Sequence, residues 1–331
     1  MQILKKLVTP SLEWLIIPII FSAILWFLPA ILGIPHPQDS YPFQLFGTFT
    51  WFTLSAGWAH IIQFFFQIAI GLTLMRWCER WQLIPLRSVI PLFVALFVMS
   101  IIADLQFFDA RTIALSLFLL AISELLSMYS YNGEKASAAF NIGFFIISAA
   151  FFHVEYAYLL VIFVIGMIIF STFTIRTFFA LLSGILVPLF LVWSAFFLSD
   201  NLPILYAILG DSHLNMFDLS SLSLLRTDVL LGGVLLVLFL MALVSYFSVS
   251  LNFKLHVRLN FFFVNLAFVL SVIWVGLFFY KLEVLLFVPI IFLILLLSFF
   301  FSTNQSKFVN IVFVAFIVLG LAYRVLNLLG F

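Results

Sequence analysis

The chain has 331 residues, of which 66% are hydrophobic and 8% are charged. Soluble domains carry about 25% charged residues, so this composition excludes a water-soluble globular protein, and a net charge of +1 gives no reason to expect a nucleic-acid partner. Apolar runs such as Val229 to Phe247 and Val284 to Phe301 approach the roughly 20 residues of a membrane-spanning helix, whereas β-barrel strands alternate over about ten residues. The sequence therefore predicts an all-α, polytopic transmembrane helical bundle.

Hydropathy places about eleven spans along the chain, in order at 12–33, 54–75, 88–103, 111–129, 138–152, 157–175, 177–198, 227–250, 259–279, 283–301 and 308–326. The stretch from Leu12 to Leu32 is too long for the core of a cleaved signal peptide, so we expect it to be the first span. Residues 1–331 are predicted to form a single integral membrane domain. Its one sizeable polar insertion is expected on the outer side, at 199–226.

The basic residues predict the orientation. With the amino terminus in the cytoplasm, ten of them fall on the inner side, namely Lys5, Lys6, Arg76, Arg80, Arg87, Lys135, Arg176, Lys254, Arg258 and Lys307. Four fall on the outer side, namely Arg111, Arg226, Lys281 and Arg324. This bias follows the positive-inside rule. We therefore expect a multi-pass protein of the bacterial inner membrane with a cytoplasmic amino terminus.

The acidic residues indicate where chemistry would occur. All seven aspartates fall on the outer side: Asp39, Asp104, Asp109, Asp200, Asp211, Asp218 and Asp228. In the loop between the third and fourth spans, Asp104 and Asp109 lie within seven residues of Arg111. Two acids and an arginine this close could supply a general base, hold a divalent cation or bind a phosphate. The alternative is a polar turn whose charges meet headgroup water.

Two other outer segments are candidates. The first, from Gly33 to Pro42, contains three prolines, His36 and Asp39, and an aromatic stretch follows it. The second carries Asp211, His213 and Asp218 within eight residues, which favours a mobile lid over an outer cavity. An ordinary solvated loop is the alternative interpretation of each.

The second span carries polar residues on one face. His60, Gln63 and Gln67 recur at i, i+3 and i+7. Buried polar groups are costly in hydrocarbon, so this face is expected to meet protein or a wet cavity. Interhelical hydrogen bonding and the lining of a substrate path both remain open.

No nucleotide-binding loop, dinucleotide fingerprint, nucleophile elbow or zinc-protease motif occurs in the sequence. No cofactor is therefore expected, although the outer acids can hold a divalent cation.

Several short motifs resemble those of an uncharacterised family of bacterial multi-pass inner-membrane proteins. They are Ala139-Phe-Asn141-Ile-Gly143-Phe, then Ala149-Ala-Phe-Phe, then Arg176, and finally Gly184-Ile-Leu-Val-Pro188. The matched pieces cover about 50 residues, and no activity is established for that family.

The outer loops are also distantly similar to those of glycosyltransferases of the GT-C class, which use polyprenyl-phosphate-linked sugars. That class has an acidic residue in its first outer loop, where this chain has Asp39 after a Pro-rich turn. A later outer loop precedes a helix beginning with Ala-Arg, as Asp109-Ala110-Arg111 does here. The chain lacks the paired acids expected around Asp39, and it has no soluble outer domain. The resemblance implies a GT-C-like helix arrangement and an activity at the outer face.

Three functions are consistent with these patterns. The first is a lipid-linked-sugar glycosyltransferase, or an inactive relative, in which Asp39 or Asp109 deprotonates the acceptor and Arg111 or Arg226 holds the lipid phosphate. The second is a non-catalytic subunit or scaffold of an envelope-assembly complex, which has a membrane protein partner. The third is a transporter or lipid flippase. Membrane lipids are expected partners in all three.

Overall fold

A computed structural model of the protein describes residues 12–32, 40–45, 49–84, 88–102, 105–130, 135–200, 202–203, 226–249, 253–277, 286–303 and 306–328. Its helices are α2 (Leu12–Ile31), α3 (Ala56–Arg80), α4 (Ile90–Ile101), α5 (Ala110–Ser130), α6 (Lys135–Ala150), α7 (Glu155–Tyr158), α8 (Leu160–Ile169), α9 (Ile175–Leu198), α11 (Arg226–Val249), α12 (Leu255–Leu277), α14 (Phe287–Thr303) and α15 (Lys307–Leu328). A helix lies at each predicted span, and the prediction of a helical protein is confirmed.

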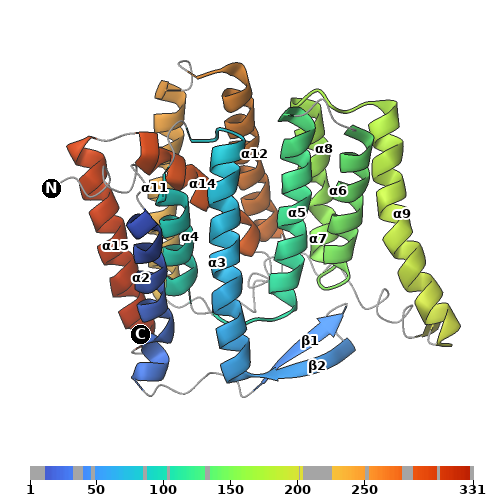
Figure 1. Ribbon diagram of the computed structural model, residues 1–331, viewed down its shortest axis with the longest axis horizontal. Helices are drawn as coiled ribbons and strands as arrows, with labels where there is room; N and C mark the ends of the chain where they lie inside the picture. Colours follow the sequence, from blue (N-terminus) through green and yellow to red (C-terminus); the bar gives the residue numbers. More distant parts are fainter. Residues whose placement is uncertain are drawn as a thin grey trace.

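Five of the helices are long and apolar enough to cross a membrane, which indicates a membrane protein. They are α3, α5, α9, α12 and α15. Successive helices run alternately up and down through the bundle (Figure 1). The connections between helices therefore lie at the two ends of the bundle, and one of these ends carries a β-hairpin.

The all-α prediction fits the structure apart from one short segment. Residues 40–55 contain an antiparallel hairpin of β1 (Ser40–Leu45) and β2 (Phe49–Ser55), in which Ser40 pairs with Ser55. The sequence of β2 is rich in aromatic residues and threonine, which favour strands over helices. For this reason α3 begins at Ala56 and not at 54. The hairpin lies at the lower end of the bundle, beside the first turn of α3 (Figure 1).

The sixth predicted span also differs in detail. Helical structure there divides into α7 and α8 and stops at Ile169, before the predicted end at 175. The next helix starts at Ile175 because Thr174 and Thr177 form a capping box, with each side chain bonded to the backbone N–H of the other.

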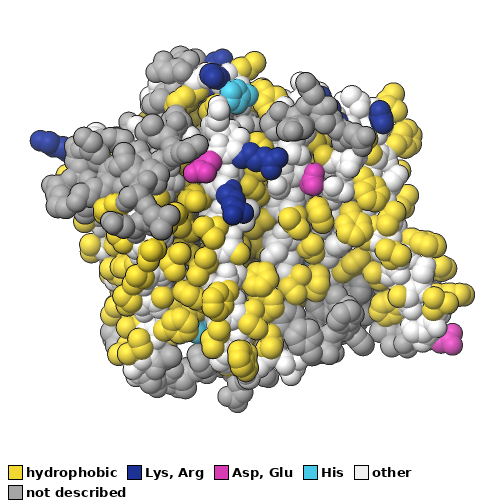
Figure 2. Space-filling view, in the orientation of Figure 1, with side chains coloured by type: hydrophobic (Ala, Val, Ile, Leu, Met, Phe, Trp, Pro, Cys, Tyr) yellow, Lys and Arg dark blue, Asp and Glu magenta, His cyan; other side chains and the backbone are white. Residues whose placement is uncertain are grey.

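Two short helices occupy the centre of the bundle. Every residue of α4 is buried, and so is every residue of α14 from Phe287 to Ser302. The helices α2, α3, α14 and α15 all contact α4. By contrast, α9 is peripheral: it packs against α6 and exposes large apolar side chains such as Phe179, Phe190 and Phe197. On the face of the molecule shown in Figure 2, apolar side chains cover much of the middle and lower surface.

Candidate functional site

The polar face of α3 is buried against neighbouring segments. His60, Gln63 and Gln67 are all buried, together with Ala59 and Phe64 of the same helix. The Gln63 side chain donates to the carbonyl oxygen of Leu105 at 3.0 Å and accepts from the hydroxyl of Thr112 at 3.0 Å. These two bonds join α3 to the loop before α5 and to the first turn of α5. The observed partners of Gln63 thus favour interhelical bonding over a substrate path.

One turn deeper, Gln67 joins α3 to two other helices. Its amide nitrogen donates to the Ser22 hydroxyl of α2 at 2.8 Å, and Ser22 in turn lies 2.8 Å from the Ser100 hydroxyl of α4. Ser100 also donates to the carbonyl of Leu96 in its own helix, which leaves Ser22 as the donor to Ser100. The three side chains form a chain of hydrogen bonds through the bundle.

His60 lies between two backbone carbonyls. Its Nε2 is 3.2 Å from the oxygen of Trp26, and its Nδ1 is 3.1 Å from the oxygen of Gln106. The Trp26 indole donates back to the His60 carbonyl at 3.1 Å, and the two rings stack with centroids 5.1 Å apart. A carbonyl only accepts, so both ring contacts are hydrogen bonds when both ring nitrogens carry protons. His60 therefore ties α2 and α3 to the loop between α4 and α5.

Sequence reasoning missed two members of this cluster, Gln106 and Arg324. Arg324 is 2% exposed, and its Nη2 donates to Gln106 Oε1 at 2.7 Å. The Gln106 amide nitrogen donates to the Ser100 carbonyl at 2.7 Å. Among the described residues no carboxylate lies within ion-pair distance of Arg324. The signal for Arg324 was its place inside an otherwise apolar helix. In the sequence analysis it counted only toward the orientation of the chain.

Asp109 caps α5 and orients Arg111. Its Oδ1 accepts from the backbone N–H groups of Arg111 at 2.9 Å and Thr112 at 3.3 Å, which is the bonding of an N-cap. Its Oδ2 pairs with Nε of Arg111. Burial raises the pKa of Asp109 above its ordinary value, and the Arg111 guanidinium and the backbone donors oppose that shift. Both carboxylate oxygens are therefore engaged in local structure.

The segment from Leu105 to Asp109 is fixed against the start of α3. The backbone N–H of Phe108 donates to the carbonyl of Ala59 at 3.1 Å. The strand β1 contacts both α3 and α5, and its first residue, Ser40, pairs with Ser55, which directly precedes α3. The hairpin, the first turn of α3 and the capped start of α5 thus lie together.

Several predicted site residues fall outside the described residues, namely Asp39, Asp104, Asp211 and His213, together with most of the insertion at 199–226. Arg226 begins α11, and its side chain is not described. The predicted roles of these residues stay predictions. Among the described residues no three His, Cys, Asp or Glu side chains group to hold a metal ion.

Glu124 of α5 bonds to the neighbouring helix α6. Glu124 Oε1 accepts from the side chain of Asn141 on α6 at 3.2 Å. Asn141 belongs to the Phe-Asn-x-Gly motif noted in the sequence, so that motif joins α5 to α6.

Comparison of the chain with family models, with curated proteins and with solved structures gives no match.

Proposed function

We propose that the chain is an eleven-span protein of the bacterial inner membrane, with its amino terminus in the cytoplasm, and that it acts at the outer face on a polyprenyl-phosphate-linked sugar. The reaction is sugar transfer in the manner of GT-C-class enzymes. The outer face is the hairpin end of the bundle, since Asp109 and the start of α3 lie there.

One observation carries this proposal. Three described positions gather at the hairpin end: Ser40 at the start of β1, Leu105 bonded to Gln63, and Asp109 at the cap of α5. In sequence, Asp39 directly precedes Ser40, and Asp104 directly precedes Leu105. Consecutive Cα atoms are about 3.8 Å apart. This connectivity supports a shared site for the outer acids.

The roles follow from what each side chain already does. Asp109 is engaged as a cap and as the partner of Arg111, so it positions that guanidinium and the base role passes to Asp39 or Asp104. The base takes the proton of an acceptor hydroxyl while the hydroxyl oxygen bonds to the sugar's anomeric carbon. The bond from that carbon to the lipid phosphate breaks, and Arg111 or Arg226 holds the departing phosphate.

The test compares lipids that copurify with the wild type, with Asp39→Asn/Asp104→Asn and with Asp200→Asn. Asp200 is an exposed outer aspartate at the end of α9 with a left-handed backbone (φ 53°), which asparagine tolerates well. We expect mass spectrometry to detect a sugar-linked polyprenyl phosphate on the wild type. Its ratio to the sugar-free lipid should rise in Asp39→Asn/Asp104→Asn and stay unchanged in Asp200→Asn.

A different observation favours the second candidate, a non-catalytic subunit of an envelope-assembly complex. The described polar side chains at the hairpin end bond mainly to one another and to backbone, as expected for groups that fix a helix arrangement. Bulk phospholipid alone on all three proteins, with an intact complex recovered after mild detergent extraction, would establish this function in place of the first. The same hydrogen bonds give no support to a transport path along α3.

A further inference from the structure

A cavity of about 470 Å³ lies at the end of α3 opposite to the hairpin. The last turns of α3 supply most of its wall, from Thr73 to Arg80, and Ser123 of α5 supplies the facing side. It opens at the surface, where Lys and Arg side chains gather over the upper part of the molecule (Figure 2). The cavity is therefore accessible from outside the bundle.

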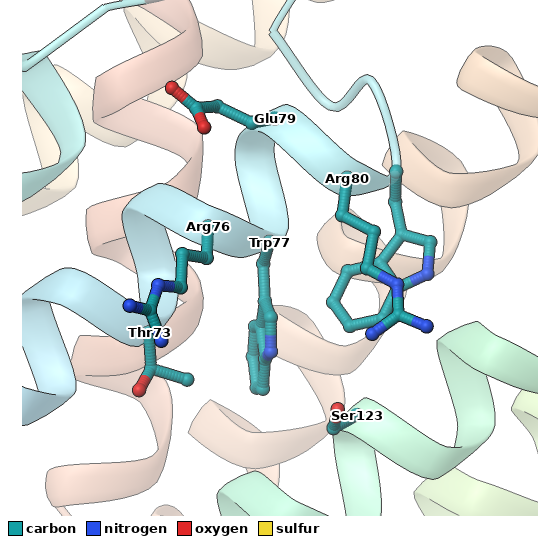
Figure 3. A pocket seen from close by; sticks show the side chains of 7 residues that line it. Thr73, Arg76, Trp77, Glu79, Arg80 and Ser123 are labelled. Carbon is teal, nitrogen blue, oxygen red and sulfur yellow. The ribbon is translucent and has the colours of Figure 1, made fainter.

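Two arginines define the chemistry of this cavity. Arg76 and Arg80 are one helical turn apart and exposed, and the indole of Trp77 lies between their side chains (Figure 3). Glu79 points away from both guanidinium groups (Figure 3). Within the described part of the chain, the ion pair is that of Asp109 with Arg111, at the other end of the bundle. Among the described residues no carboxylate forms an ion pair with Arg76 or Arg80, although Glu79 also lines the cavity.

Aromatic rings hold one of the two arginines in place. The guanidinium carbon of Arg80 is 5.7 Å from the centre of the Trp81 ring, within the range of a cation–π contact. Trp81 is itself buried and packs on Trp77 with ring centroids 5.7 Å apart. Arg80 is thus presented by a rigid support, which lowers the entropy lost when it binds a ligand.

The most suitable ligand for two guanidinium groups that line one cavity on either side of an indole is a phosphate. Their planar forks match phosphate oxygens in pairs, and among the described residues no ion pair has to be broken first. Basic clusters at the cytoplasmic end of a spanning helix attract anionic headgroups, and tryptophans favour the same interfacial depth. Ser123 adds a hydroxyl from the opposite wall.

We propose that this cavity binds a phosphate group, with Arg76 and Arg80 holding its oxygens. The phosphate belongs to an anionic lipid headgroup or to a soluble phosphate compound. The site is at the end of the bundle remote from the outer acids, and its existence does not depend on the proposed sugar transfer.

The test is native mass spectrometry of the purified full chain with phosphatidylglycerol, with diacylglycerol as the phosphate-free lipid, and with inorganic phosphate. The variant is Arg76→Gln/Arg80→Gln. The matched control is Arg176→Gln/Lys307→Gln, which removes the same charge from exposed positions on other helices. We expect the first variant to bind phosphatidylglycerol about tenfold more weakly or worse, and the control to bind it as the wild type does.

Inorganic phosphate separates the two sources. Phosphatidylglycerol that resists millimolar phosphate identifies a lipid site, whereas phosphate binding that displaces the lipid and depends on the same two arginines identifies a soluble ligand. The proposal is overturned if the two double variants lose equal affinity, if neither loses any, or if diacylglycerol binds as tightly as phosphatidylglycerol. Because the substituted side chains are exposed, both double variants should keep the thermal stability of the wild type. Thermal unfolding of the same samples checks this.

Discussion

Gln106 contacts three separate parts of the chain. Its side chain accepts from Arg324 of α15 and donates to the Ser100 carbonyl of α4, and its backbone oxygen faces the His60 ring of α3. Arg324 is a buried cation, and its Nη2 donates to this amide oxygen at 2.7 Å. Hydrogen bonds to charged groups contribute about 1.5–3 kcal/mol when neither partner can reach water. Gln106 therefore holds α15 to the α3–α4 region by a polar contact.

A double-mutant cycle measures this contact. Gln106→Leu and Arg324→Met should each destabilise the protein, because each leaves a buried polar partner unsatisfied. The double variant should be less destabilised than the sum of the two by about 1–2 kcal/mol, measured by unfolding in mixed micelles. Gln106→Leu combined with Asn265→Leu is the control, since Asn265 bonds within α12. That pair should be additive, and additivity in the first pair as well would contradict the assigned bond.

At the residue scale the sequence predicted one side of this cluster and not the other. His60, Gln63 and Gln67 were recognisable because helical periodicity puts i, i+3 and i+7 on one face. Their partners Gln106 and Leu105 come from a distant part of the chain, and Arg324, which bonds to Gln106, is 218 residues away from it. No local pattern encodes such a pairing. Asp109 differs, because its helix-cap bonds are local, to the backbone of Arg111 and Thr112, whereas the sequence analysis treated it only as a functional acid.

The crossing of α6 and α9 depends on two glycines. A Cβ added to Gly184 would lie 2.1 Å from the backbone oxygen of Phe140, and one added to Gly143 would lie 2.5 Å from that of Leu181. The two backbones are thus in direct contact, as small residues permit between membrane helices. Both glycines belong to the motifs Phe-Asn-x-Gly and Gly-x-x-x-Pro noted in the sequence. Their role in the structure is packing.

Gly184→Ala should separate these helices. The new methyl group meets backbone and not a flexible side chain, so we expect a loss of about 2 kcal/mol or more in unfolding free energy. Gly276→Ala in α12 is the matched control, because no atom lies within 4 Å of its added Cβ. Helix propensity alone should make that variant about 0.5–1 kcal/mol more stable. Equal effects of the two substitutions on thermal stability would show that the α6–α9 contact is looser than described.

The elements themselves were largely readable from the sequence, since long apolar runs in a chain this poor in charge have few alternatives to helix. The hairpin of β1 and β2 was not, because Pro42 and the aromatic residues around it suit both a strand and an interfacial segment. Helix lengths were also overestimated where the helix is central. The spans predicted at 88–103 and 283–301 became α4 and α14, both shielded by other helices.

At the scale of the whole molecule, short central helices and long outer ones are consistent with one membrane protein. With 12 residues, α4 is about 18 Å long, less than the roughly 30 Å of a hydrocarbon core. Its ends are enclosed by α2, α3 and α15, so its shortness exposes no helix terminus to lipid. The peripheral helix α9, in contrast, has 24 residues and a broad apolar surface. It is the helix best suited to test the orientation of the bundle.

Cysteine labelling at the two ends of α9 provides that test. The chain has one cysteine, the buried Cys78, so a Cys78→Ala background leaves no native thiol. Arg176→Cys and Asp200→Cys then place exposed thiols just inside and just beyond the two ends of the helix. In spheroplasts a membrane-impermeant maleimide should label Asp200→Cys at once and Arg176→Cys only after permeabilisation, because the positive-inside rule puts the arginine end in the cytoplasm. The opposite order would invert the protein and move the acidic hairpin end to the cytoplasm. Labelling of both thiols in intact spheroplasts would mean that α9 does not cross the membrane, and the eleven-span topology would fail with it.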